Sequence, residues 1–221
     1  MADYTEISRF TKKEELANAA SHFAGALLAV AGLALMIVQS ARFGNAWHII
    51  STSIFGASMI MLYMSSAMTH YLKQGPLKNI FFSLDRIAIY ILIAGTYTPF
   101  ALVTLRGALG WTIFGIEWAC AIAGSTMVLA KPVKFEKGVN TIAVVTYAIM
   151  GWLIIIAIVP LINNMVPAGW ILIIAGGLFY TIGIFFYKKG KFLYHHLVWH
   201  LLVIGGTLAH FFAIYYFVIP R

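Results

Sequence analysis

Seven apolar segments of similar length divide the chain, and they restrict its possible folds more than any other feature. Each has about the 20 residues that a helix needs to cross ~30 Å of hydrocarbon. We therefore predict an all-α, polytopic membrane protein, a bundle of seven transmembrane helices. The segments run over Asn18 to Gln39, Trp47 to Tyr71, Leu84 to Leu105, Leu109 to Leu129, Val139 to Leu161, Gly169 to Tyr187 and Leu197 to Ile219.

The composition excludes several classes of protein. Hydrophobic residues make up 62% of the chain and charged residues 10%, against roughly 45 to 50% and about 25% in soluble domains. A soluble nucleic-acid-binding domain and a disulfide scaffold are therefore set aside.

The single cysteine, Cys120, lies in an apolar run, and we interpret it as a packing residue. The net charge of +8 comes from basic residues between the apolar runs, where lipid headgroups are their expected neighbours.

The segments between the apolar runs are too short for a second domain. They contain helix breakers such as Gly75-Pro76, Pro132, Asn163-Asn164 and Pro167. The first residues are polar and charged, without an apolar stretch that ends in a small-residue cleavage site, so we do not expect the first span to be a cleaved signal peptide. We predict a short polar tail over residues 1–17 and one transmembrane domain over residues 18–221.

The basic residues predict the orientation, because lysine and arginine accumulate in short cytoplasmic loops. Of the 15 lysines and arginines, three lie on one side of the membrane in the predicted bundle: Arg42, Arg106 and Arg221. We therefore predict a cytoplasmic N-terminus and, with an odd number of spans, a C-terminus outside. The residues of the opposite, cytoplasmic face are Arg9, Lys12, Lys13, Lys73, Lys78, Arg86, Lys131, Lys134, Lys137, Lys188, Lys189 and Lys191.

Four ionisable residues lie at the predicted cytoplasmic ends of three spans. They are His70, Asp85, His196 and His200, each within roughly 10 Å of the helix end at ~1.5 Å per residue. Ionisable side chains are costly in a bilayer, and those that persist usually face the bundle interior and mark a site. Their matching depth predicts one shared site.

The histidine spacing fits a metal centre. His196 and His200 are four residues apart, so both rings project from one helix face and can share a metal. His70 at matching depth is the candidate third ligand, which leaves the fourth position of a tetrahedral zinc for water. Zinc bound in this way makes hydroxide available near neutral pH. The alternative is an interfacial pair of histidines bonded to loop carbonyls.

Asp85 and Ser66 are the candidate catalytic residues beside such a centre. Asp85 can accept a proton from water or hold it by a hydrogen bond. Ser66, four residues before His70 and on its face, can hold the same water or polarise a substrate carbonyl. The alternatives are an ion pair of Asp85 with Arg86, a carboxylate at a helix N-terminus, and a hydroxyl bonded to its own helix.

A polar stripe lies at the start of the first span, where Glu14, Asn18 and His22 recur every four residues. One interpretation is structural: Glu14 pairs with Lys73 or Lys78, or Asn18 with a loop carbonyl, and the tail is fastened to the bundle. The other is that the stripe gates access to the site from the cytoplasm.

Other ionisable residues are not assigned to the site. Glu117 lies in the outer half of the fourth span, where a protonated or hydrogen-bonded carboxyl is expected rather than a catalytic one. His210 is ten residues beyond His200, thus ~15 Å further along the helix, and cannot share the same metal. His48 and His195 lie at span boundaries and are interpreted as interfacial.

In their order along the chain, these motifs resemble the bacterial hemolysin III family, within the progestin and adipoQ receptor superfamily of seven-helix membrane proteins. The resemblance covers nearly the whole chain. It rests on Glu14-x3-Asn18-x3-His22, Ser66-x3-His70, Asp85, the run from Ala88 to Phe100, His196-x3-His200 and His210.

The resemblance implies a zinc ion held by His70, His196 and His200, with Asp85 and Ser66 near the metal-bound water on the cytoplasmic side. It also implies a bacterial inner-membrane location. Membrane lipids are the expected partners and possible substrate; neither nucleic acid nor a protein partner is inferred.

Two functions are compatible with this sequence. The first is an intramembrane zinc hydrolase of a lipid amide or ester, as the ceramidase-like chemistry of relatives implies. The alternative is a membrane-active cytolysin, or a regulator of membrane or ion homeostasis, in which the zinc is structural.

Overall fold

A computed structural model describes residues 10–130, 141–189 and 192–221. The basic residues Arg9, Lys131, Lys134, Lys137 and Lys191, which contribute to the predicted orientation, lie outside the described residues. So do Pro132 and the beginning of the predicted fifth span at Val139.

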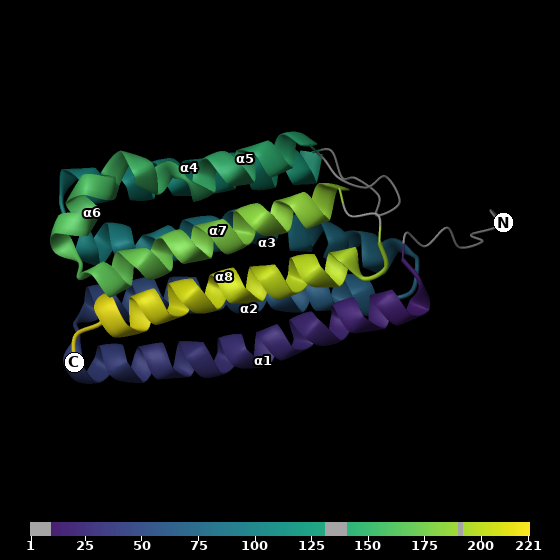
Figure 1. Cartoon of the computed structure of the whole chain (residues 1–221), viewed down its shortest axis with the longest axis horizontal. Helices are drawn as coiled ribbons and strands as arrows, with labels where there is room; N and C mark the ends of the chain where they lie inside the picture. The colour runs from purple at the N-terminus through teal and green to yellow at the C-terminus, as the bar shows by residue number, and fades with distance from the viewer. Residues whose placement is uncertain (1–9, 131–140, 190–191) are drawn as a thin grey trace.

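Seven helical spans in the described part of the chain are long and apolar enough to cross a membrane. The predicted all-α, seven-span architecture is thereby confirmed. The first two spans and the fourth are single helices, as are the sixth and seventh (Figure 1), whereas the third and fifth change helix type within the span. The elements are α1 (Lys12–Phe43), α2 (Ala46–Tyr71), α3 (Pro76–Pro99), η1 (Phe100–Thr104), α4 (Ala108–Ala130), α5 (Thr141–Gly151), η3 (Leu153–Ala157), α6 (Ile158–Asn164), α7 (Pro167–Lys189) and α8 (His195–Phe217).

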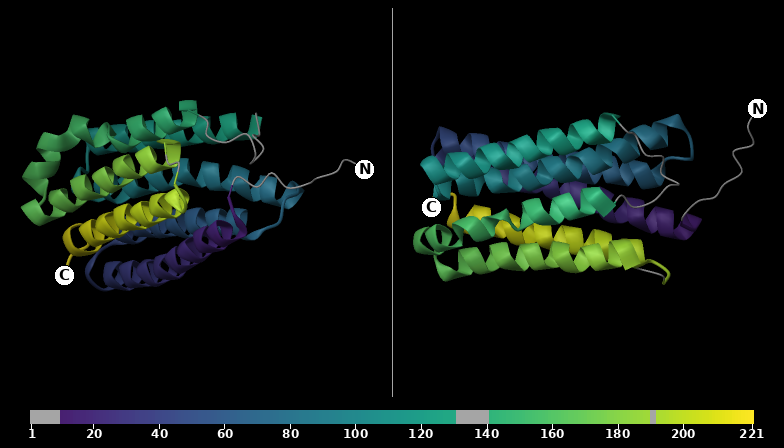
Figure 2. Two further views of the ribbon diagram at one scale, coloured as in Figure 1. Left: turned by 45° about the vertical axis from the view of Figure 1, so that its right-hand side comes forward. Right: turned by 90° about the horizontal axis from the view of Figure 1, so that it is seen from above.

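The spans run alongside one another as a single bundle (Figures 1 and 2). Successive helices pack as neighbours from α1 to α4, and α7 packs on α8. The last helix, α8, returns to pack against α1. Helix α1 begins at one end of the bundle and α8 finishes at the opposite end (Figure 1), as an odd number of spans requires.

Local sequence explains where several helices begin. Thr11 caps α1 in a reciprocal capping box with Glu14, which satisfies two backbone donors that the first turn leaves unpaired. Asn45 caps α2 through its side chain. Helix α3 starts at Pro76 after Gly75, whose φ of 154° is accessible to glycine and strained for other residues.

Two spans depart from regular α-helix in the half of the bundle away from the predicted site. Pro99 ends the regular part of the third span, and a π-helical segment, η1, follows. The fifth span breaks after Gly151 and continues as the 3-10 segment η3. There the Tyr97 hydroxyl donates to the Gly151 carbonyl at 3.0 Å and accepts from the Ile154 N–H at 2.8 Å. A side chain of α3 thus satisfies backbone groups that the break would leave unpaired in a membrane.

Apolar side chains fill the bundle and also cover its outside. Met36, Phe55, Leu161 and Ile214 are fully buried in one continuous core. Large aliphatic residues such as Leu27 remain exposed on the outer helix faces, where hydrocarbon is their natural solvent. Cys120 is half-buried and packs against a smaller apolar cluster, in line with its interpretation as a packing residue.

Candidate metal centre

Three histidines converge at the end of the bundle where α1 begins. His70 comes from the last turn of α2, and His196 and His200 from the first turns of α8. One ring nitrogen from each lies within 4.8 Å of the others, and all three residues are buried. The two sequence motifs therefore meet in space at a separation that one metal ion can bridge.

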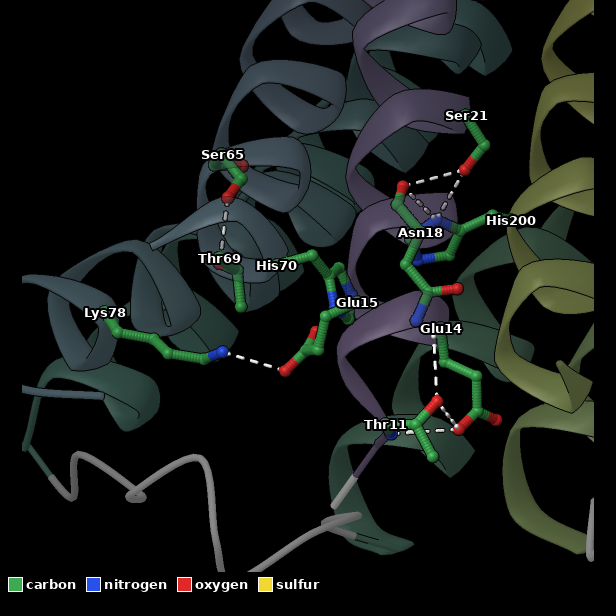
Figure 3. A network of polar contacts seen from close by, with 10 residues as sticks. All are labelled: Thr11, Glu14, Glu15, Asn18, Ser21, Ser65, Thr69, His70, Lys78 and His200. Carbon is green, nitrogen blue, oxygen red and sulfur yellow. Dashed lines mark hydrogen bonds and ion pairs between the residues drawn. The ribbon is translucent and has the colours of Figure 1, made fainter. Parts of the chain in front are cut away.

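Glu15 of α1 orients the ring of His70 (Figure 3). Its Oε2 lies 2.6 Å from Nδ1 of His70, and its Oε1 accepts from Nζ of Lys78 at 2.9 Å. Because a carboxylate only accepts, Nδ1 must carry the hydrogen, and Nε2 is left with the lone pair that binds a metal. Sequence reasoning did not identify Glu15. The prediction that Glu14 pairs with Lys73 or Lys78 is wrong, because Glu15 pairs with Lys78 instead. Adjacent residues on a helix point in different directions, so Glu14 faces α8 while Glu15 faces α2 and α3.

The backbone of α1 orients His200 in the same way. Nδ1 of His200 lies 3.1 Å from the carbonyl oxygen of Asn18 and 3.0 Å from Oγ of Ser21 (Figure 3). A carbonyl cannot donate, so Nδ1 of His200 is the donor and Nε2 is the available ligand atom. The Asn18 side chain is fully buried, and neither its oxygen nor its nitrogen has a hydrogen-bond partner among the described residues.

Glu14 and Phe10 connect the start of α1 to the segment that carries His196. Oε1 of Glu14 accepts from the backbone N–H of Tyr194 at 2.9 Å, while its Oε2 accepts from Thr11. Tyr194 adopts a left-handed conformation with φ of 63° immediately before α8. The Phe10 ring stacks on His196 at 4.9 Å between centroids. These contacts fasten the start of α1 to the start of α8.

His22, the third member of the predicted stripe, lies directly against the histidine cluster. Its ring stacks on that of His200 with centroids 3.6 Å apart and planes 9° from parallel. With Glu14 and Asn18 also buried, the stripe faces the site rather than lipid.

Asp85 and Ser66 border the same cavity as the three histidines. The Asp85 carboxyl is half-buried and interacts with the hydroxyl of the buried Ser66. It also experiences the charge of Arg86, the neighbour named in the alternative interpretation. The geometry therefore brings the carboxyl and the hydroxyl into the cavity.

From the histidines the cavity extends into the bundle between α3, α5, α7 and α8. Its walls are mainly apolar, with side chains such as Leu92, Val144, Ile184 and Val203. It reaches His210, which lies two to three turns further along α8.

Three other ionisable residues, His210, Glu117 and His48, lie apart from the three histidines, whereas His195 is the chain neighbour of His196 and its Nδ1 lies 3.2 Å from the carbonyl oxygen of Phe186. Nε2 of His210 donates to the carbonyl of Ile173 at 3.1 Å. Glu117 is fully buried in α4, and neither carboxyl oxygen has a hydrogen-bond partner in the described part of the chain. His48 contacts the cap residue Asn45.

Comparison with known proteins identifies the same family that the sequence motifs resemble. The family described as "Haemolysin-III related" matches residues 10–211. "Hemolysin-3" of Bacillus cereus is 40% identical over 216 residues, 98% of this chain and 96% of that protein. A "Hemolysin-3 homolog" of Bacillus subtilis (strain 168) is 42% identical over 208 residues, 94% of this chain and 96% of that protein. The human "Monocyte to macrophage differentiation factor" is 26% identical over 91% of this chain and 83% of its own length.

Proposed function

The chain belongs to the hemolysin III family of multi-pass membrane proteins, and we propose that it is a zinc-dependent hydrolase of a lipid amide or ester. The observation that carries the proposal is the convergence of three buried histidines at one end of a mainly apolar cavity. The Asp85 carboxyl and the Ser66 hydroxyl border the same cavity.

The donor set suits zinc. Three neutral imidazoles, with the fourth position left to water, are one of the ligand sets found in catalytic zinc sites. The hydrogen bonds of Nδ1 in His70 and His200 commit each ring to one tautomer, so both present Nε2. When bound, zinc would supply a Lewis acid for the substrate carbonyl and a source of hydroxide at neutral pH.

The side chains of the cavity supply the other parts of a hydrolysis. The oxygen of water adds to the carbonyl carbon, and the bond from that carbon to nitrogen or oxygen breaks. Asp85 receives the proton that water loses and transfers it to the leaving amine or alcohol. Ser66, whose hydroxyl interacts with Asp85, orients the water or the carbonyl oxygen by a hydrogen bond.

The rest of the cavity is suited to the apolar part of a lipid. Its walls hold an acyl chain and keep bulk water from the carbonyl. With the predicted orientation, the histidines lie on the cytoplasmic side of the membrane, where membrane lipids are the substrate pool.

Turnover by the purified protein tests the proposal. Zinc-loaded protein in lipid nanodiscs is incubated with a panel of lipid amides and esters, and released fatty acid is measured by mass spectrometry. We expect release by the parent protein and loss of at least about 100-fold in Asp85→Asn, the size of a general acid-base contribution. The control is Glu117→Gln, a buried carboxyl outside the cavity. Absence of fatty acid release from the whole panel at full zinc occupancy would refute a hydrolase.

A second candidate is a membrane-active protein with a structural metal, because two similar proteins carry the name hemolysin. Liposome experiments distinguish it. Ion or dye flux that persists in Asp85→Asn, without any turnover of lipid, would favour this candidate.

A further inference from the structure

Arg86 of α3 places a buried positive charge on the wall of the cavity. The residue is 7% exposed, and its guanidinium lies over the Phe82 ring, 5.7 Å from the centroid. An arginine side chain does not lose its proton in a protein, so the charge is permanent. A buried charge is costly unless a partner compensates it, and within a membrane span such charges usually mark a functional site. The charge of Arg86 therefore calls for a partner.

The described residues do not supply this partner. The guanidinium of Arg86 forms no ion pair and no hydrogen bond with them. The carboxyl of Asp85, its neighbour in the chain, interacts with the hydroxyl of Ser66 and experiences the charge of Arg86 only from a distance. The backbone of Arg86 is engaged instead, since its carbonyl accepts from the Tyr147 hydroxyl at 2.9 Å. The anion that compensates the guanidinium has to come from a ligand.

The guanidinium nitrogens are accessible to a ligand. Several buried polar atoms of this protein, such as those of Glu117 and Nδ1 of His210, have neither a hydrogen-bond partner nor accessible surface. The nitrogens of Arg86 are not among these sealed atoms. They lack a partner but keep accessible surface, and the residue borders the cavity. A group bound in the cavity can therefore reach them.

The cavity changes from charged to apolar along α3. Asp85 and Arg86 border it near the start of the span, and apolar residues such as Ile89 and Leu92 follow them on the same wall. The acyl chain of a lipid belongs in the apolar part. We therefore expect its polar headgroup beside Arg86.

Two aromatic rings connect Arg86 with the candidate metal centre. Phe82, whose ring the guanidinium covers, packs with Phe10 in one small cluster. The Phe10 ring in turn stacks on His196, with centroids 4.9 Å apart. The positive charge and the histidines are therefore neighbours on the wall of one cavity, and a short headgroup can extend from one to the other.

We infer that Arg86 binds the anionic headgroup of a lipid, a carboxylate or a phosphate, on the leaving-group side of the bond that is cleaved. The planar guanidinium offers pairs of parallel N–H donors that match the oxygens of either group. The inference rests on the proposed function in placing the lipid carbonyl at the histidines. It adds a substrate class, namely lipid amides and esters whose leaving group carries a negative charge.

Binding, rather than turnover, tests this inference. The ligands are two lipid analogues with the same alkyl chain, in which a sulfonamide replaces the amide so that water cannot add to a carbonyl. The N-alkylsulfonylglycine ends in a carboxylate, and the N-alkylsulfonylethanolamine ends in a neutral hydroxyl. Purified, zinc-loaded protein in phosphatidylcholine nanodiscs is titrated with each, and affinity is followed by fluorescence of the cavity tryptophans Trp152 and Trp199.

The measured quantity is the ratio of the affinity for the carboxylate to the affinity for the hydroxyl. We expect this ratio to fall roughly 10- to 100-fold in Arg86→Gln, the size of hydrogen bonds to a charged group. Arg86→Lys keeps the charge without the planar fork, so it should lose only part of the ratio. If Arg86→Gln does not fold, Arg86→Met removes the same charge and keeps an unbranched apolar stem.

The matched control is Arg106→Gln. Arg106 also lies over an aromatic ring, that of Trp47, but it is exposed and does not border the cavity. Its replacement should leave the ratio at the value of the parent, because loss of net charge alone does not remove the headgroup contact.

Several outcomes would overturn the inference. One is a ratio that stays unchanged in Arg86→Gln, and another is equal binding of both analogues by the parent. Inorganic phosphate serves as a competitor: if it bound at Arg86 as tightly as the carboxylate analogue, the site would belong to a free anion rather than to a lipid. An Arg86-dependent ratio in a protein that cleaves no lipid would support the inference and count against the hydrolase alone. Cleavage of neutral lipid amides with an unchanged ratio would do the reverse.

Discussion

The carboxylate of Glu15 in α1 accepts a hydrogen bond from Nδ1 of His70 in α2 over 2.6 Å, and Lys78 of α3 neutralises its other oxygen at 2.9 Å. One side chain thereby links the first three helices at the candidate metal centre. Glu14 reaches the start of α8 from the neighbouring position, and the Asn18 carbonyl reaches His200. The first turns of α1 therefore support all the segments that carry the histidines.

Removal of the Glu15 carboxylate is expected to weaken metal binding without abolishing it. In Glu15→Gln the histidine loses a charged acceptor, so we expect zinc affinity to fall roughly 10- to 100-fold, as for other residues that orient a ligand histidine. Competition with a chromophoric chelator measures this affinity. Glu15→Asp should recover part of the loss, whereas Glu117→Gln should leave the affinity unchanged. Equal affinities for the parent and Glu15→Gln would contradict the assigned role.

Removal of any one histidine of the centre is expected to eliminate stoichiometric zinc. Elemental analysis of detergent-purified protein should find about one zinc per chain, the content of a single three-histidine site. His70→Ala, His196→Ala and His200→Ala should each lose it, while Asp85→Ala should largely keep it. A well-folded parent without bound metal would instead make these histidines a buried polar cluster.

Loss of the Tyr97 hydroxyl is expected to destabilise the bundle. Tyr97→Phe leaves the N–H of Ile154 and the carbonyl of Gly151 without their partner, and we expect a cost of about 1 to 3 kcal/mol. Unfolding in mixed micelles measures the change, with the exposed Tyr216→Phe as control. Zinc content should be retained. A Tyr97→Phe variant as stable as the parent would show that the break in the fifth span does not depend on this hydroxyl.

Replacement of Glu117 by an apolar residue is expected to stabilise the protein. The carboxyl is fully buried and has no hydrogen-bond partner among the described residues, so it carries an uncompensated desolvation cost. We expect Glu117→Leu to raise the midpoint of thermal unfolding, with zinc content unchanged. A lower midpoint would reveal a stabilising interaction of this carboxyl, and Glu117→Gln distinguishes a hydrogen bond from a charge.

The number of spans and the depth of the histidines could be predicted from sequence because both are local. A run of apolar residues long enough to cross the bilayer forms a helix whatever its neighbours are. The spacing of His196 and His200 puts both rings on one helix face. The similar distance of His70 from the end of its helix then indicates the same level in the membrane.

The support of the histidines could not be predicted in the same way. Glu14 and Glu15 are adjacent acidic residues, and the sequence motif points to Glu14. Which of the two meets His70 depends on how α1 is rotated against α2 and α3. That rotation results from packing along the whole length of these helices.

The sequence by itself determined the solvent of the chain, its seven spans and the residue types available for a metal centre, because hydropathy and helical periodicity act over short stretches. The tertiary structure decided which groups complete that centre and how far the cavity extends from it. Glu15, the carbonyl of Asn18 and the Nε2 donor of His210 meet their partners only when α1, α2, α7 and α8 pack together. The physical reason is that a hydrogen bond depends on distances of a few tenths of an ångström between atoms of different helices, which no local pattern specifies.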